Sequence, residues 1–172
     1  METPAIKTAV VMQRTRPASR WQPFQWKLAE VASDTLLPDA PPRCLRNDDA
    51  DTRWLFTGFD VSLYPDEAEG YFLNIEAPAP CWFVMWRIED IDGVEVAVPK
   101  QVTLSYNEAA RLMDGGEQVD ALPAPQDIVE RMRAFVAEHY KPEPKKKRRK
   151  PSFEGGAGVE QMARAEGGSD GR

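Results

Sequence analysis

Two runs of aromatic and β-branched residues in the middle of the chain constrain its fold more than any other feature. The first is TRWLFTGFDVSLY at residues 52–64, and the second is CWFVMWRIED at residues 81–90. Alternation of large side chains is typical of β-strands, whose successive residues point to opposite faces. In the first run it places Leu55, Thr57, Phe59, Val61 and Leu63 on one face and Trp54, Phe56 and Tyr64 on the other. Both runs are predicted to be strands, and apolar residues on both faces indicate that neighbouring elements cover them.

A tight hairpin is predicted directly after the second run. The dipeptide Asp92-Gly93 separates that run from VEVAV, and Asp-Gly between apolar runs favours a two-residue turn. The hairpin is therefore expected near residues 84–98. Pro99 is expected to end or bend the second arm, because proline cannot donate a backbone hydrogen bond, and QVTLSY is expected to resume the strand.

Three further segments are predicted to be strands: IKTAVVM at residues 6–12, the alternating residues Phe24, Trp26 and Leu28, and YFLNIEA at residues 71–77. Between Tyr64 and Tyr71, the segment PDEAEG is expected to form a compact turn whose flanking strands pair antiparallel. Residues 33–51 are rich in proline and aspartate and are expected to form a long connection with little regular structure. Short connections after residue 52 predict an antiparallel meander, either a curled sheet or a small open barrel of about five to seven strands.

Two helices are expected to follow the strands. In SYNEAARLMDGG, at residues 105–116, Ser105 or Asn107 is expected to cap the first helix, and Gly115-Gly116 is expected to end it. The second helix covers about residues 125–140 and has its apolar residues at helical spacing: Ile128, Val129, Met132, Phe135 and Val136. This amphipathic helix is predicted to cover one face of the sheet, which gives an α+β fold.

Charge divides the chain into two parts. Residues 1–140 carry 13 Lys and Arg against 23 Asp and Glu, a net charge of −10, whereas residues 141–172 carry nine against five, a net charge of +4. The first part holds nearly all the aromatic residues and is predicted to be a single folded domain. The second part, basic and then glycine-rich, lacks the apolar residues of a core and is predicted to be disordered. An acidic domain repels phosphate backbones and anionic lipids, so nucleic-acid binding is expected only through the tail, and membrane binding is not expected.

The sequence lacks the residue patterns that most catalytic and metal sites need. His139 is the only histidine, and it is expected to complement the dipole at the end of its helix. Cys44 and Cys81 form no metal-ligand or redox motif and are expected to be reduced thiols. The sequence contains no nucleotide-binding or serine-hydrolase motif, export signal or membrane-spanning apolar run. We therefore expect a cytoplasmic protein without enzymatic activity, cofactor or metal.

Aromatic and charged residues provide two candidate binding sites. The candidate partner-binding residues are Trp54, Tyr64, Glu67, Glu69, Tyr71, Trp82 and Trp86. Core packing is the favoured interpretation of the tryptophans, because their strands lack the Lys and Arg of a nucleic-acid stacking platform, and a protein partner is the functional alternative. The candidate polyanion-binding residues are the six consecutive bases Lys145, Lys146, Lys147, Arg148, Arg149 and Lys150. Such runs are typical of polyanion-binding segments and also of solvated linkers.

Several runs of the chain resemble a bacterial family of unknown function. They are RWQPFQWKLAEV, FDVSLYPDEAEGYFLNIEAPAPCWFVMWR, VTLSYNEAARLMDGG and EHYKPEPKKKRR, and the likeness extends over residues 7–150. Members of that family are typically encoded beside molybdenum-containing formate dehydrogenases, ferredoxin-like proteins and maturation chaperones. The resemblance implies a role near the assembly or operation of that enzyme, and it implies no catalytic or binding residue.

Three hypotheses of function remain open. The leading one is a non-enzymatic accessory or adaptor protein in the assembly or maturation of a formate dehydrogenase, with a subunit or maturation factor of that enzyme as partner. The second is a polyanion-binding module that acts through residues 145–150. The third is a small-molecule-binding protein or enzyme related to the molybdenum cofactor, with a pocket between Trp54, Trp82 and Trp86.

Overall fold

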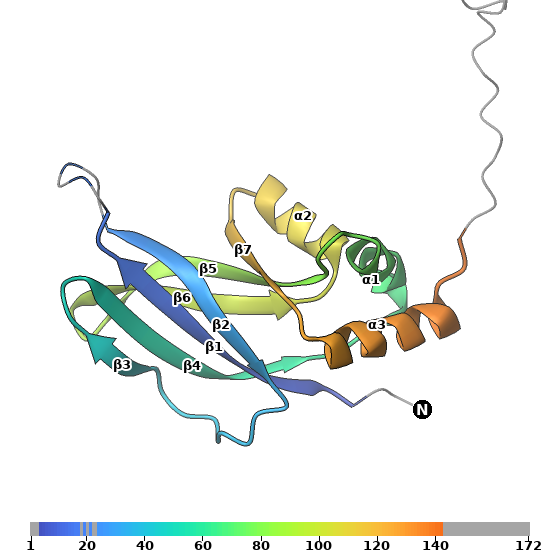
Figure 1. The fold of residues 1–172 in the computed structure, drawn as a ribbon, viewed down its shortest axis with the longest axis horizontal. Helices are drawn as coiled ribbons and strands as arrows, with labels where there is room; N and C mark the ends of the chain where they lie inside the picture. Colours follow the sequence, from blue (N-terminus) through green and yellow to red (C-terminus); the bar gives the residue numbers. More distant parts are fainter. Residues whose placement is uncertain (1–3, 18, 20, 22–23, 143–172) are drawn as a thin grey trace, which may run out of the picture. The chain divides into compact units, whose positions relative to one another are not determined.

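Seven β-strands and three α-helices make up the regular structure of the described residues (Figure 1). The structure is a computed structural model, and it describes residues 4–17, 19, 21 and 24–142. The strands are β1 (Ile6–Thr15), β2 (Gln25–Ser33), β3 (Arg43–Asn47), β4 (Asp51–Val61), β5 (Cys81–Ile91), β6 (Val94–Thr103) and β7 (Gln118–Pro123). The helices are the short 3₁₀ helix η1 (Pro65–Glu67), α1 (Ala68–Ile75), α2 (Tyr106–Asp114) and α3 (Gln126–His139). These elements lie in one compact unit, Met1–Tyr140, and the predicted α+β class is confirmed.

A four-stranded antiparallel sheet has the order β2-β1-β4-β3. β1 pairs with both β2 and β4, so the first strand of the chain lies inside the sheet and not at its edge. Its alternate residues Val10 and Met12 are fully buried, because this face of the sheet meets the second sheet. The strands predicted at residues 6–12 and around Trp26 are confirmed, whereas β3 falls in the segment expected to lack regular structure.

A three-stranded antiparallel sheet has the order β6-β5-β7, with the aromatic run of β5 at its centre. The predicted β5–β6 hairpin is confirmed, because Asp92 and Gly93 have the positive φ values, 51° and 87°, that its two-residue turn requires. β6 continues through Pro99, which is tolerated on an edge strand at a point where the pairing register shifts. β7 pairs with the other side of β5 and is not among the strands predicted from the sequence.

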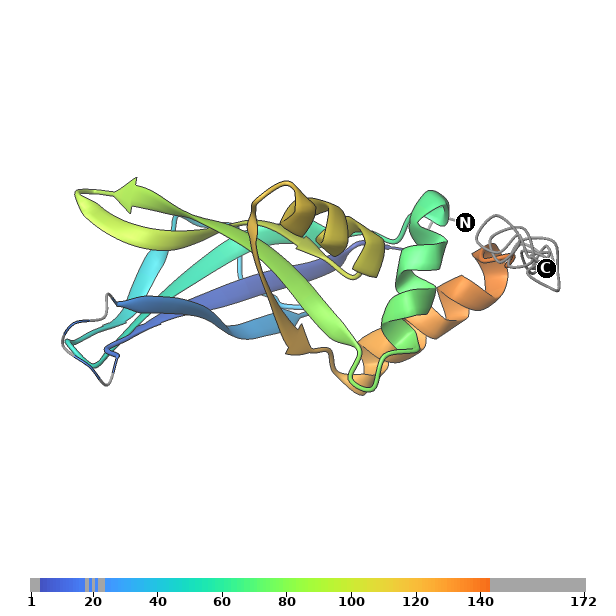
Figure 2. The ribbon, with the colours of Figure 1, turned by 90° about the horizontal axis from the view of Figure 1, so that it is seen from above.

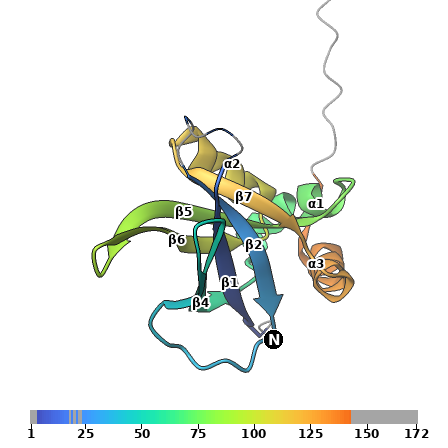
Figure 3. The same cartoon turned by 60° about the vertical axis from the view of Figure 1, so that its left-hand side comes forward.

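The two sheets pack face to face, and their strands cross steeply (Figure 3). They meet along two seams, where β2 lies beside β7 and β4 lies beside β6. At the first seam the backbone N–H of Leu28 donates a hydrogen bond to Asp120 Oδ2 (2.8 Å), so a side chain takes the place of the next strand. The core between the sheets comprises Val10, Met12, Leu28, Phe56, Val84, Trp86, Val96 and Ala97. The result is two open sheets and not the single meander in which each strand pairs with the next.

The three helices gather at one end of the two sheets (Figures 1 and 2). α1 and α3 pack against each other, and their apolar residues join the nearby strand ends in a second core cluster. α2 lies against β5 and β7, where the Tyr106 ring packs edge-on against Phe83 with 6.3 Å between the ring centroids. The amphipathic helix α3 forms as predicted, but α2 covers the outer side of β5. None of the described helices is long and apolar enough to cross a membrane.

The helix α1 replaces the turn and the strand predicted for residues 65–77. Pro65 opens η1, and α1 follows directly. The buried residues Ala68, Tyr71, Asn74 and Ile75 recur at intervals of three and four, which is the period of a helix and not of a strand. The predicted pairing of this segment with residues 52–64 is therefore wrong, because β4 pairs with β1 and β3.

A bulge at Gly58 corrects the predicted faces of β4. Gly58 has a φ of 88°, and the pairing register with β1 shifts at this point. A shift by one residue turns the following side chains to the other face, so Phe56 and Phe59 both contact the core between the sheets. Leu55 and Thr57, predicted to share the face of Phe59, lie instead on the outer face.

The buried side chain of Asn74 ties α1 to both strands of the β5–β6 hairpin. Its Nδ2 donates to the carbonyl oxygens of Cys81 (2.8 Å) and Leu104 (2.9 Å), and its Oδ1 accepts from the Cys81 N–H (2.9 Å). Cys81 begins β5, and Leu104 directly follows β6. Asn74 is only 1% exposed, so water cannot readily replace these hydrogen bonds if the amide is removed.

Replacing Asn74 by alanine is expected to lower the free energy of unfolding by about 2–4 kcal/mol, because buried backbone groups lose their hydrogen-bond partner. The matched control is Asn107→Ala, which removes one hydrogen bond to the exposed Glu69 and is expected to cost less than about 0.5 kcal/mol. Urea unfolding followed by circular dichroism measures both variants. Equal losses in the two variants would contradict the role of Asn74.

Candidate functional site

Two polar segments of the chain meet where η1 and α1 contact α2. Glu67 Oε1 accepts a hydrogen bond from Ser105 Oγ (2.6 Å), and Glu67 Oε2 accepts one from Arg111 Nη2 (2.9 Å). Ser105 is the N-cap of α2, as predicted, and its Oγ accepts from the Glu108 N–H (3.1 Å). One carboxylate thus fixes both the start and the middle of α2. We call Glu67, Glu69, Ser105, Asn107 and Arg111 the α1–α2 junction.

Gly70 allows the close approach of the two helices. A Cβ atom on Gly70 would lie 2.0 Å from Ser105 Oγ and 3.3 Å from the backbone nitrogen of Asn107. On the adjacent residue, Glu69 Oε1 accepts a hydrogen bond from Asn107 Nδ2 (3.0 Å). The glycine that suggested a turn in the sequence therefore serves a contact between helices.

Exposed aromatic rings flank the junction. Tyr64, 56% exposed, directly precedes η1, and Tyr106, 50% exposed, is the first residue of α2. The side chains of Asp66 and Glu69 are also exposed, whereas the cation Arg111 already has a carboxylate partner. We call Tyr64, Asp66, Glu69 and Tyr106 the α1–α2 surface. Tyrosine is enriched in protein–protein interfaces, because its large ring buries apolar area while its hydroxyl still bonds.

Three of the predicted partner-binding residues, Tyr64, Glu67 and Glu69, are brought together at this place. Tyr106 and Asn107 are not among the predicted contact residues, because the sequence of their segment predicts only the start of a helix. A signal was present, since the first turn of that helix carries an aromatic residue and an amide at positions that do not fit its apolar face.

The other predicted partner-binding residues are buried or partly buried. Tyr71 and Trp82 are almost fully buried, Trp86 is buried between the sheets, and Trp54 packs against the same cluster as Trp86. The prediction of Tyr71, Trp82 and Trp86 as contact residues is wrong, and core packing, the favoured interpretation of Trp82 and Trp86, is confirmed. Trp54 is only partly buried, so its role as a contact residue stays a prediction. Trp82 lies in a different core cluster from Trp54 and Trp86, so the pocket predicted between the three is wrong as well. The predicted polyanion-binding residues 145–150 lie outside the described residues.

The buried Tyr71 stabilises the backbone next to the α1–α2 junction. Its ring packs edge-on against Phe135 of α3 with 5.7 Å between centroids, and its hydroxyl oxygen accepts a hydrogen bond from the Tyr64 N–H (3.0 Å). Burial raises the pKa of Tyr71 to about 12, with smaller contributions from the carboxylates of Glu67 and Glu108. The phenol therefore stays neutral at physiological pH, and its role is to hold the backbone at Tyr64.

The hydroxyl of Ser105 and the imidazole of His139 contact structural partners, and the thiols of the two cysteines form no disulfide with each other. The hydroxyl of Ser105 is engaged with a carboxylate, and the ring of His139 packs on Phe135 with 4.3 Å between centroids. Cys44 and Cys81 are both free, and burial raises the pKa of the Cys81 thiol. Within the described ranges, no three His, Cys, Asp or Glu side chains are grouped in a way that could hold a metal ion.

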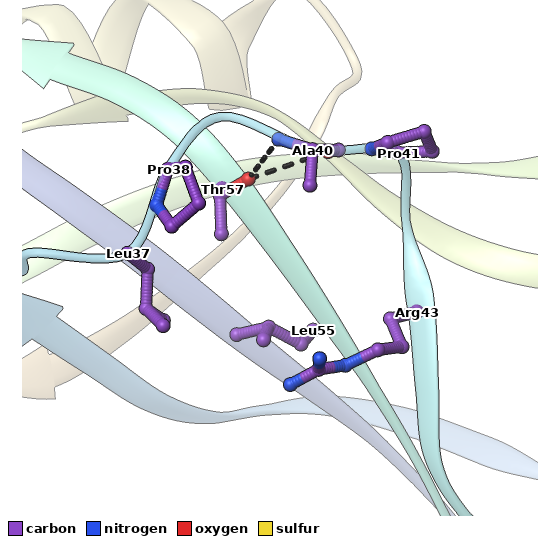
Figure 4. Close-up of a pocket in the computed structure, with 7 residues that line it drawn as sticks. All are labelled: Leu37, Pro38, Ala40, Pro41, Arg43, Leu55 and Thr57. Atoms are coloured by element: carbon purple, nitrogen blue, oxygen red, sulfur yellow. Dashed lines mark hydrogen bonds between the residues drawn. The ribbon is translucent and has the colours of Figure 1, made fainter.

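A small apolar pocket lies on the outer face of β4 (Figure 4). The loop that leads to β3 arches over the strand, and Thr57 Oγ1 accepts from the Ala40 N–H (2.9 Å) and donates to the Ala40 carbonyl (3.3 Å). Leu37, Leu55 and the stem of Arg43 point into the space below the loop. Its volume of about 90 Å³ is far below the roughly 300 Å³ of the smallest typical ligand sites, so it is a packing gap.

The family of the chain follows from a match over most of its sequence. Residues 7–149 match the family described as Protein of unknown function (DUF3305). The chain belongs to this family. The match extends from β1 past α3, so both sides of the α1–α2 junction are part of the DUF3305 region. No curated protein and no solved structure matches the chain. The description of DUF3305 names no activity.

Replacing Gly70 by alanine is expected to lower the free energy of unfolding by about 2–3 kcal/mol, because the new Cβ would collide with Ser105. Gly115→Ala is the matched control, since Gly115 is the C-cap of α2 and its Cβ would meet no atom closer than 3.4 Å. The control is expected to be nearly neutral. Chemical denaturation measures both, and a neutral Gly70→Ala variant would refute the close contact.

The raised pKa of Tyr71 predicts a loss of stability at high pH. The unfolded chain releases this proton near the ordinary value of 10.0, whereas the folded chain holds it to about pH 12. The stability that the neutral Tyr71 phenol gives to the fold is therefore fully present below pH 10. As the pH rises from 10 to 12, the free energy of unfolding falls by up to about 2 kcal/mol. Unfolding curves across this range are expected to show a smaller decline for Tyr71→Phe than for the natural protein. The exposed Tyr106→Phe control should keep the full decline, and the same slope in both variants would count against the prediction.

Proposed function

We propose that this DUF3305 chain is a non-enzymatic accessory protein that binds another protein through the α1–α2 surface. The observation that carries the proposal is the exposure of Tyr64 and Tyr106 beside a junction whose own polar groups are already paired. A ring on a rigid base loses little conformational entropy when it binds, which explains the frequency of tyrosine among interface hot spots.

The polar groups of the junction favour binding over catalysis. Ser105 Oγ both donates and accepts within the fold, and each oxygen of Glu67 has a donor. A nucleophile needs a nearby base to take its proton, and a proton-transfer group needs an oxygen or nitrogen free to reach the substrate. The hydrogen bonds of Ser105 and Glu67 instead hold α2 against α1.

We further propose that the partner is a subunit or a maturation factor of a formate dehydrogenase, and that the two meet in the cytoplasm. This part of the proposal rests on the likeness of the sequence runs to a family encoded beside such enzymes. The carboxylates of Asp66 and Glu69 favour a partner whose contact region carries Lys and Arg, because complementary charge speeds and orients association.

The test is co-purification of formate dehydrogenase subunits and maturation factors with the tagged full chain from a bacterium that encodes both. The double variant Tyr64→Ala/Glu69→Lys is expected to reduce the recovery of the partner about tenfold or more. Loss of one tyrosine that becomes buried in an interface commonly costs over about 1 kcal/mol of binding free energy. Glu138→Lys on α3 is the matched control, because its side chain is 75% exposed and the charge change is the same. The control is expected to recover the partner as the natural chain does.

A deletion strain provides the second measurement. We expect slower formate oxidation in that strain, with recovery on re-expression of the natural chain but not of the double variant. If the natural chain recovers no dehydrogenase subunit or maturation factor and the deletion strain oxidises formate normally, the proposed partner is wrong.

A further inference from the structure

A cleft opens between the two sheets, away from the helices. It is lined by Arg14 and Trp26 from the four-stranded sheet, by Phe24 just before β2, and by Ile88 and Glu95 from the three-stranded sheet. Figure 2 shows the β5–β6 hairpin and the β1–β2 pair extending away from the helices in the same direction. The cleft volume of about 560 Å³ lies within the range of small-molecule sites, roughly 300–1,000 Å³, and differs in this respect from the packing gap on β4.

The strand β1 turns Arg14 into this cleft. Val10, Met12 and Arg14 alternate along one face of β1, and the first two are fully buried between the sheets. In the pairing register, Arg14 lies between Trp26 of β2 and Thr52 of β4. A guanidinium group therefore occupies the position where the apolar interior ends.

Arg14 is held in place without being neutralised. Its Nη2 donates to Thr52 Oγ1 (3.3 Å), and its Cζ lies 4.2 Å from the centroid of the Phe24 ring. It forms no ion pair with any carboxylate of the described residues, although the domain around it is acidic. A guanidinium has five N–H donors in a planar fork, so most of its donors are available to an anionic group.

The other residues that line the cleft indicate the shape and charge of a ligand that would fit. Phe24 and Ile88 are 45% and 47% exposed, and Trp26 is partly buried, so apolar surface lies on both sides of Arg14. This surface suits a planar ring, because flat ligands stack on aromatic side chains. Glu95 stands on the opposite sheet, where its carboxylate repels a second negative charge.

We propose that this cleft binds a small planar ring compound with a single anionic group. The anionic group pairs with the guanidinium of Arg14, and the ring packs against Trp26 and Ile88. This site is separate from the α1–α2 surface, so it stands whether or not that surface binds a protein.

The test uses two fluorescent probes that differ only by an anionic group: 8-anilinonaphthalene-1-sulfonate and the neutral N-phenyl-1-naphthylamine. Arg14→Met is expected to weaken binding of the sulfonate about tenfold or more and to change binding of the neutral probe less than about twofold. Arg53→Met is the matched control, because Arg53 lies on the adjacent strand and pairs with Asp51. The control is expected to bind both probes as the natural chain does.

A second variant keeps the test decisive if Arg14→Met does not fold. Ile88→Asp places a negative charge in the cleft on an exposed position of the hairpin, and Val94→Asp places the same charge beside the hairpin turn. Weaker sulfonate binding in Ile88→Asp but not in Val94→Asp supports the site. Equal sulfonate binding by each variant and its control, or equal losses of the two probes in Arg14→Met, would overturn the proposal.

Discussion

The helical end of the molecule depends on the buried amide of Asn74. α1 has eight residues and no side-chain N-cap, and a helix of that length is not stable by itself in water. Its hydrogen bonds to Cys81 and Leu104 attach it to the start of β5 and to the residue after β6. Because α1 begins directly after Glu67, the amide also determines where the α1–α2 junction forms.

Elements with a local signal could be predicted from the sequence. The β5–β6 hairpin follows from a dipeptide that accepts positive φ, and α2 follows from a serine cap and two terminal glycines. The arrangement in two sheets could not be predicted in this way. β1 pairs with β4, about 45 residues later, and patterns in a single sequence do not indicate such distant pairings. The bulge at Gly58 could not be predicted either, because large side chains alternate on both sides of it and give no sign of a shifted register.

The candidate site was only partly predictable for a related reason. The sequence predicts Tyr64, Glu67 and Glu69 as contact residues in and beside an acidic turn between strands, and they lie instead at a contact between helices. Aromatic character alone does not separate exposed Tyr64 from buried Tyr71, because Tyr64 precedes η1 whereas Tyr71 lies on the buried face of α1. The place of Arg14 beside Trp26 required the strand register, which composition does not contain.

At the seam between β2 and β7, a side chain takes the place of the hydrogen-bond ladder that a neighbouring strand would supply. Within the four-stranded sheet, separating β1 from β2 would break a ladder of backbone hydrogen bonds, whereas at the seam the Leu28 N–H meets a carboxylate of Asp120. A hydrogen bond to a charged group contributes about 1.5–3 kcal/mol, less than a ladder of several bonds. The two walls of the cleft belong to different sheets, so they are joined by side-chain packing and this single hydrogen bond and not by a continuous backbone ladder.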